Sequence, residues 1–378
     1  MEQKNDNFMQ SVMNAINGNN TMVSVNTDAK PLAWNGVMGC KSFSTPVTVS
    51  EAAEEVGANY EVKKHHMVAI TDELYDAIIN GTPITEATFT KGCIVSSHMA
   101  TMREDNGHIL GCVGKDYGVI QNAKALEFLN MITSGEIDGT EKAVIETAGI
   151  LDGGARFYMT AKMPENITIP GDRFGIEDYI VFTTSHDGTN AVQAFFTPIR
   201  VVCKNTLNYA MKSAKNKLVF RHTSRVNERM DWNNEENRRM AVQTLQMHKH
   251  FKEAFVNDLI AMQNIKISGD TDIAKFCGKL FADEKELNLL AKANYNADSV
   301  EELSTRKKNL IRAMQDTIVS GVGQSEHQNT GLWLLNGVTS YFQNTKPWKT
   351  EEDKFDGIMG GDASRKVQKA RELIYEMV

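Results

Sequence analysis

Apolar and polar residues alternate in three pairs of segments along the first half of the chain, and each pair predicts a β-hairpin. Each pair flanks a turn that contains Asp and Gly. The three are 93–103 and 108–113 around Asp105-Asn106-Gly107, 143–151 and 155–163 around Asp152-Gly153-Gly154, and two strands around Asp187-Gly188. Asp-Gly between apolar runs is typical of tight hairpins, because the central turn residues take positive φ.

Other segments repeat their apolar residues at helical spacing. Residues 49–56, with Ser50 as N-cap, and residues 72–79 predict two short helices before the first hairpin. A third helix follows the first hairpin, and a fourth is expected to begin near Cys203. Within the fourth, a buried stripe is expected at the residues spaced i, i+3, i+4 and i+7, which are Leu207, Ala210, Met211 and Ala214.

From Trp232 onward only helical spacing remains. Asp283-x-x-Glu286 and Ser299-x-x-Glu302 have the capping-box pattern that marks helix starts. We therefore predict an α+β fold, with a curved antiparallel sheet of hairpins, helices on one face of it, and a mostly helical C-terminal region. The predicted divisions are a polar tail with a short amphipathic helix (1–30), an α+β core domain (31–230) and a helical region (231–378).

Charge is distributed unevenly along the chain. Between residues 200 and 225 there are seven basic residues and no acidic one: Arg200, Lys204, Lys212, Lys215, Lys217, Arg221 and Arg225. Removing these seven from the chain's 41 Lys and Arg leaves 34 against 48 Asp and Glu, and the whole chain has a net charge of -7. This asymmetry predicts one positive surface on an otherwise negative body, although a run of lysines also occurs on ordinary solvated helices.

Cysteine use and hydropathy indicate a cellular compartment. The five cysteines are widely spaced and odd in number, which favours reduced thiols over a disulfide framework. There is no long apolar stretch and no signal-peptide pattern at the N-terminus. We expect a cytoplasmic protein of a bacterial host, without a membrane partner.

No motif for catalysis, cofactor binding or metal binding is present. Zinc spacings, the dinucleotide fingerprint, the phosphate-binding loop of NTPases and the serine nucleophile elbow are all missing. The spacing of His98 and His108 would let them face each other across the first hairpin, but two ligands do not make a metal site. We therefore expect no cofactor, no catalytic residues and no stoichiometric zinc. The alternative is an enzyme whose site is assembled from distant residues such as His186, Asp187 and Asn205.

The stretch TPIRVVCKNTLNYA at 197–210 resembles the phage/plasmid-like proteins, family 932 of the domains of unknown function. The segments 31–39, 117–128, 148–163 and 331–341 are similar to other parts of that family's pattern, with Gly337 where the family usually has alanine. The resemblance implies a phage or plasmid origin and no established activity. The order of helices and hairpins is also similar, at the level of topology, to single-strand annealing proteins of the Red-beta, Erf and RecT class.

The function expected from these observations is binding of single-stranded nucleic acid through the seven basic residues. The expected role of this binding is strand annealing in recombination or replication. Tyr209 and Phe220 are candidates for base stacking. The alternative is a protein-interaction module, such as an inhibitor of a host factor or an assembly component. A homo-oligomer is expected, because hairpin sheets leave open edges and the apolar stripe Phe8, Val12 and Ile16 needs a groove.

Overall fold

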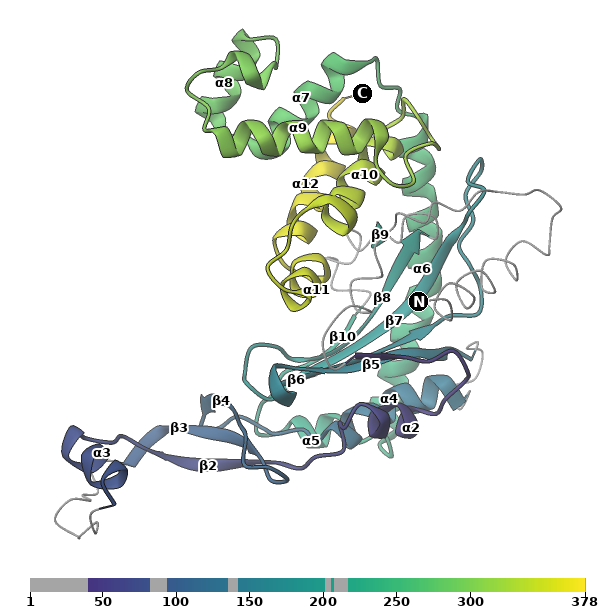
Figure 1. The fold of residues 1–378 in the computed structure, drawn as a ribbon. Coiled ribbons are helices and arrows are strands. Elements are labelled where there is room, and N and C mark those ends of the chain that lie inside the picture. Colours follow the sequence, from purple (N-terminus) through teal and green to yellow (C-terminus); the bar gives the residue numbers. More distant parts are fainter. Residues whose placement is uncertain (1–39, 82–93, 135–141, 201–204, 207–216, 378) are drawn as a thin grey trace.

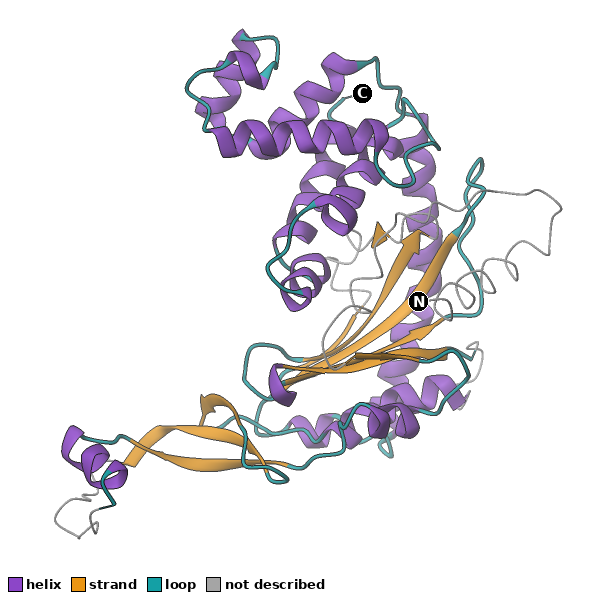
Figure 2. Ribbon diagram, viewed as in Figure 1, coloured by secondary structure: helices purple, strands orange, loops and turns teal. Residues whose placement is uncertain are grey.

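The computed structural model describes residues 40–81, 94–134, 142–200, 205–206 and 217–377. These residues form a large antiparallel sheet, a smaller antiparallel sheet and a C-terminal group of helices (Figures 1 and 2). The predicted α+β class is confirmed, and so are the three hairpins.

The large sheet has the order β1-β5-β6-β7-β8-β10, with β9 also pairing with β8. Its strands are β1 (Cys40–Ser42), β5 (Val144–Leu151), β6 (Arg156–Lys162), β7 (Ile176–Ser185), β8 (Val192–Arg200), β9 (Asn205–Thr206) and β10 (Lys217–Phe220). The turn between β7 and β8 holds Gly188 at a φ of 81°, as predicted, but Asp187 does not take the positive φ that was expected of both central residues.

Both faces of the large sheet are apolar at its centre, because side chains alternate along each strand. Phe157 and Met159 belong to the core on one face, and Tyr158, between them, belongs to a smaller cluster on the other. The first face is covered by α2 (Val49–Glu55) and α4 (Asn122–Ser134), which lie below the sheet in Figure 1. The second face receives Phe355, so helical cover extends beyond the one face that the sequence predicted.

The small sheet forms an arm that projects from the body (Figure 1). It contains β2 (Val62–Val68), β3 (Ile94–Arg103) and β4 (Ile109–Gly114), and α3 (Asp72–Ile79) lies at its tip. Along β2, only Val62 is fully buried, and along β3 only Thr101. The outer part of the arm therefore has almost no core of its own.

The C-terminal helices pack around one apolar core, to which Ile167, Ile169 and Ile176 of the sheet region also belong. The main helices are α6 (Glu235–Asn264), α7 (Asp270–Phe281), α8 (Glu284–Lys292), α9 (Thr305–Ser320), α10 (Gly331–Ser340), α11 (Glu351–Met359) and α12 (Asp362–Tyr375). Helix α6 runs alongside both regions (Figure 1): its first half packs on the core below the sheet, and its second half on the helical core.

Helix starts were predicted with mixed success. The capping box of Asp283 and Glu286 is confirmed at α8. The predicted N-cap Ser50 is wrong, because Thr48 caps α2 in a capping box with Glu51. The helix start proposed at Ser299 is also wrong, since Ser304 caps α9.

The helix expected to begin near Cys203 does not begin there, because Asn205–Thr206 is a strand paired with Ile199 and Arg200. Residues 207–216, which hold the predicted buried stripe, lie outside the described residues. In the part of the chain that the structure describes, no helix is both long and apolar enough to cross a bilayer.

Candidate nucleic-acid interface

Four of the seven predicted basic residues lie in the described part of the chain, and these four follow one edge of the large sheet. Arg200 ends β8 and Lys217 begins β10, the outermost described strand beside it. Arg221 and Arg225 come directly after β10, beyond the opposite end of β8. A strand of the length of β8 spans about 30 Å, so these residues lie along a sheet edge and do not share one helix face. Lys204, Lys212 and Lys215 lie outside the described residues.

Arg221 and Arg225 are exposed, and neither forms an ion pair with any described residue. The backbone between them is nevertheless fixed. Gly118 N donates to His222 O, and the His222 ring Nδ1 lies 3.0 Å from Gly118 O. A Cβ on Gly118 would lie 2.1 Å from Thr223 O, so this close approach requires glycine. The two arginines are therefore held at a defined position.

An open cleft of about 650 Å³ lies beside these arginines, at the junction of the arm and the body. We call it the arm–body cleft. It is lined by residues of three segments: Ser96 and Ser97, Gly114 to Tyr117, and His222 to Ser224. Its polar groups include four Ser and Thr hydroxyls, the exposed cation of Lys115 and the carboxylate of Asp116. Hydroxyls and a cation in an open cleft can hydrogen-bond to phosphate oxygens.

His222 adds no charge to the arm–body cleft near neutral pH. Its ring stacks on Tyr117 with centroids 4.6 Å apart and planes 11° from parallel. Burial lowers the pKa of His222, and the hydrogen bond to Gly118 O and the nearby Asp187 only partly oppose this. The cations of this region therefore include Lys115, Arg221 and Arg225, together with Lys64, whose Nζ donates to Lys115 O at 2.7 Å.

Phe220 is not available for base stacking. Its side chain is 1% exposed and meets the Trp232 ring edge-on at 5.8 Å in the core below the sheet. The other stacking candidate, Tyr209, lies outside the described residues. Tyr117, which sequence reasoning did not single out, is the aromatic residue that lines the arm–body cleft.

His186 is a buried structural residue. Its Nε2 lies 2.9 Å from Asn122 Oδ1, and its backbone oxygen accepts a 2.6 Å hydrogen bond from Thr101 Oγ1. Burial, followed by the nearby His222, lowers its pKa to about 4, against the opposing effect of Asp187. Asp187 caps the turn by accepting from the Thr189 backbone and hydroxyl. The pair therefore does not present the open acid–base geometry of the enzyme hypothesis, and the Asn205 side chain is not described.

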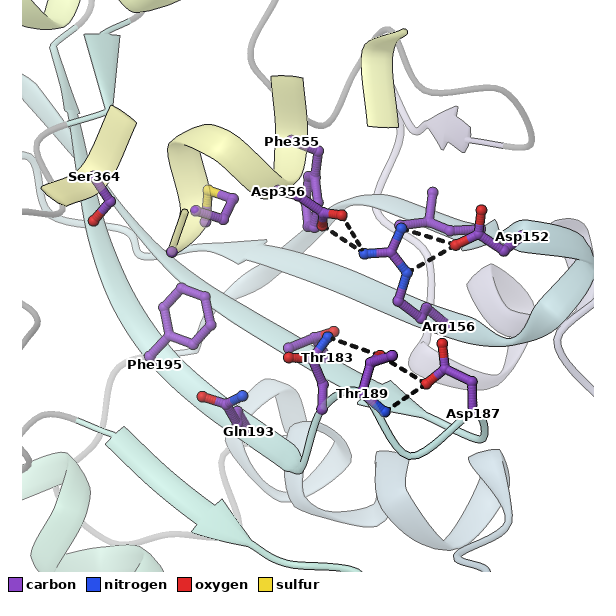
Figure 3. Close-up of a pocket in the computed structure, with 14 residues that line it drawn as sticks. Asp152, Arg156, Thr183, Asp187, Thr189, Gln193, Phe195, Phe355, Asp356 and Ser364 are labelled. Carbon is purple, nitrogen blue, oxygen red and sulfur yellow. Dashed lines mark hydrogen bonds and ion pairs between the residues drawn. The ribbon is translucent and has the colours of Figure 1, made fainter. Parts of the chain in front are cut away.

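A second cavity, of about 760 Å³, lies between the upper face of the large sheet and α11 (Figure 3). Arg156 lies in its wall and is paired with Asp152 at 2.8 Å and Asp356 at 2.5 Å. Asp187 lines the same cavity, so three carboxylates accompany one guanidinium. This excess of negative charge disfavours a phosphate ligand, and the arginine instead connects the sheet to α11.

His98 and His108 do not face each other across the first hairpin. His98 lies opposite Gly114 in the arm, while His108 lies in the β3–β4 connection. By contrast, Asp172, Glu326 and His327 come together from distant parts of the sequence. Sequence reasoning missed this cluster because no local spacing connects residue 172 with residues 326 and 327.

Comparisons with known proteins give one result. No curated protein and no solved structure matches the chain. Residues 109–372 match the family described as Domain of unknown function (DUF932), and they include the whole large sheet except β1, the basic segment and nearly all of the C-terminal helices. On this match, which covers well over half of its length, the chain belongs to the DUF932 family.

Proposed function

We propose that this protein binds single-stranded nucleic acid along the β10 edge of the large sheet and in the arm–body cleft. The observation that carries the proposal is the placement of Arg221 and Arg225. Both are exposed and free of ion pairs with described residues, and they flank the cleft-lining residues 222–224. A guanidinium that is not already paired can give its full charge to a phosphate.

The proposed binding is driven by neutralisation of phosphates, which releases counterions and does not depend on the nucleotide sequence. Arg156, in the other cavity, cannot act in this way because two carboxylates already hold it. In the arm–body cleft, Lys115 and the hydroxyls of Ser96, Ser97, Thr223 and Ser224 supply further donors. Tyr117 is the candidate contact for a base at the cleft wall. The finer proposal is that binding promotes annealing of complementary strands.

The test is a titration of a fluorescent oligo-dT of about 30 nucleotides, followed by anisotropy at several salt concentrations. The variant combines Arg221→Gln with Arg225→Gln. Each lost single-strand phosphate contact lowers the slope of log affinity against log salt by about 0.7, so the double variant should lose about 1.4. Its melting temperature should not change, because both side chains are exposed and neither forms an ion pair with a described residue.

A matched control removes the same charge elsewhere. Arg306 and Lys285 are exposed residues of α9 and α8, in the helical region. The double variant Arg306→Gln and Lys285→Gln should keep the wild-type salt slope. Absence of binding by the wild-type protein at low salt would contradict the proposal, and so would equal slopes for the two double variants. Mixing complementary labelled strands with the wild-type protein then tests annealing by energy transfer.

A protein-interaction module is the second candidate, and the tip of the arm favours it. Large apolar side chains are exposed there on α3 and on the adjoining strand ends: Val68, Ile70, Tyr75, Ile78, Ile79 and Ile94. Tyr75 and Ile79 are 57% and 65% exposed. A small sheet with so little core is marginal alone. A second copy of the chain offers the same apolar surface and could cover it symmetrically.

Light scattering tests this second candidate. If arm tips pair, the wild-type protein is a dimer or larger at micromolar concentration, and Tyr75→Ser with Ile79→Ser converts it toward a monomer. The melting temperature of the monomeric variant should then fall with the lost contact. A wild-type monomer, or an oligomer that the double variant leaves intact, would exclude arm-tip pairing.

A further inference from the structure

Asp172, Glu326 and His327 place three potential ligand atoms within 4.8 Å of one another. Asp172 lies in the connection between β6 and β7, and the other two lie in the connection between α9 and α10. Their side chains are almost completely buried, with exposed fractions of 0%, 4% and 2%. We propose that these three residues form a binding site for a transition-metal dication, with Zn²⁺ as the ion that fits best.

The first support is the spacing of His327 and Asp172. His327 Nε2 lies 3.6 Å from Asp172 Oδ2, which is too far for a hydrogen bond. Two ligand atoms that are each about 2.1 Å from one ion, at a tetrahedral angle, lie about 3.4 Å apart. The observed separation therefore resembles that of two atoms sharing an ion more closely than that of a donor and its acceptor.

The second support is the unsatisfied nitrogen of His327. Nε2 is buried and has no hydrogen-bond partner among the described residues. A buried polar atom without a partner is costly, and native proteins rarely leave one. An ion bound to this nitrogen would satisfy it, and Asp172 Oδ2 is close enough to bind the same ion.

The third support is charge. Two carboxylates in a buried site repel each other unless cations compensate. Arg173 provides one compensating charge, since its Nε donates to Glu326 Oε1 at 2.9 Å. A dication bound between the three residues would add two further positive charges beside these carboxylates. Asp172 Oδ1 accepts from the backbone nitrogens of Phe174 and Gly175, which orients the carboxylate so that Oδ2 is the atom nearest His327.

The ligand set indicates the ion. One imidazole nitrogen with two carboxylate oxygens suits Zn²⁺ and its first-row neighbours, whereas Mg²⁺ and Ca²⁺ prefer oxygen alone. Three protein ligands leave a further coordination position for water. The ion would also link the β6–β7 connection to the helical core, where Ile167 and Ile169 already pack. This proposal replaces the expectation from sequence that the protein holds no zinc.

The experiment uses the full chain after treatment with EDTA and gel filtration. Zn²⁺ is added by isothermal titration, and Co²⁺ is added separately as a spectroscopic probe. We expect about one Zn²⁺ per chain, a melting temperature that rises with Zn²⁺ concentration, and visible absorption from bound Co²⁺. Asp172→Asn and His327→Gln should each weaken Zn²⁺ binding by more than about 100-fold, since even groups around the ligands contribute 10- to 100-fold.

The matched control is Glu165→Gln, which changes an exposed carboxylate in the same connection; among the described residues its ion pair is with Lys252 at 3.4 Å. It should bind Zn²⁺ like the wild-type protein. Two separate variants keep the test decisive if one of them fails to fold. The proposal is overturned if EDTA and Zn²⁺ leave the wild-type melting temperature unchanged and no stoichiometric binding is seen. It is equally overturned if both ligand variants bind as the wild type does, because the ion then lies elsewhere.

Discussion

Replacing His186 with glutamine should remove a large part of the pH dependence of stability. The Asn122 amide nitrogen donates to Ala58 O at 2.9 Å, so its oxygen faces His186 Nε2, which must carry the proton. Glutamine can place an amide N–H at the same point. The variant therefore keeps the hydrogen bond to Asn122 and loses only the group that titrates.

The magnitude follows from the pKa of His186, which is about 4 in the folded protein against 6.5 as the ordinary value. Between these values the unfolded chain binds more protons than the folded one, so stability falls as pH falls. The full contribution of His186 is present above pH 6.5 and is lost toward pH 4. Two and a half pKa units correspond to about 3 kcal/mol in total, and about 2 kcal/mol of that falls between pH 7.5 and 5.0.

Urea unfolding followed by tryptophan fluorescence at pH 7.5 and 5.0 measures this difference. The wild-type protein should lose about 2 kcal/mol more than His186→Gln over the interval. The pKa of His222 is also lowered, but that group titrates in both proteins, so the comparison isolates His186. Equal losses of stability in the two proteins would refute the reasoning, since His186 would then not be held neutral by burial.

Two further predictions concern packing. Phe355→Ala should lower the free energy of unfolding in urea by about 3–4 kcal/mol, because a cavity replaces a ring that is 6% exposed and whose centroid lies 5.0 Å from that of Tyr158. A loss below about 1 kcal/mol would mean that α11 is not docked on the sheet. Gly337→Ala should lower the melting temperature, because the new Cβ would lie 2.4 Å from Ile318 Cγ1 and 2.8 Å from Ile318 Cα. Alanine favours the helix by about 1 kcal/mol over glycine, and this gain does not offset the clash. A melting temperature at or above that of the wild type would show that α9 and α10 can separate without cost.

Sequence patterns of a few adjacent residues correctly predicted turns and helix starts that depend only on those residues. The turn at Asp187-Gly188 and the capping box at Asp283 depend on the conformations of a few adjacent residues, and both are present. Such patterns failed near Cys203. The residues there have helical spacing, but Asn205 and Thr206 pair with Arg200 and Ile199 in the sheet, so strand pairing and not helical spacing decides their structure.

The candidate site could be predicted only in part, because contacts between distant parts of the chain decide which groups are available. The sequence gives the run of positive charge, but it does not tell which cations are already neutralised. Arg156 is held by two aspartates, one of them 200 residues away, whereas Arg221 remains free of such pairing among the described residues. The cluster of Asp172 with Glu326 and His327 is likewise created by the docking of two distant connections. Neither fact has a signal in local spacing.

Helix α6 has a consequence for how the protein unfolds. Its 30 residues extend for about 45 Å. Met240 and Val242 pack on the core below the sheet, while Phe255 and Leu259 are buried in the helical core. Helices form cooperatively along their length. If either core unfolds, the apolar residues of α6 that pack on that core become exposed, although they belong to the same helix that packs on the other core. The sheet and the C-terminal helices should therefore exchange their most protected amides at similar free energies, as one foldon, with the arm opening earlier and separately.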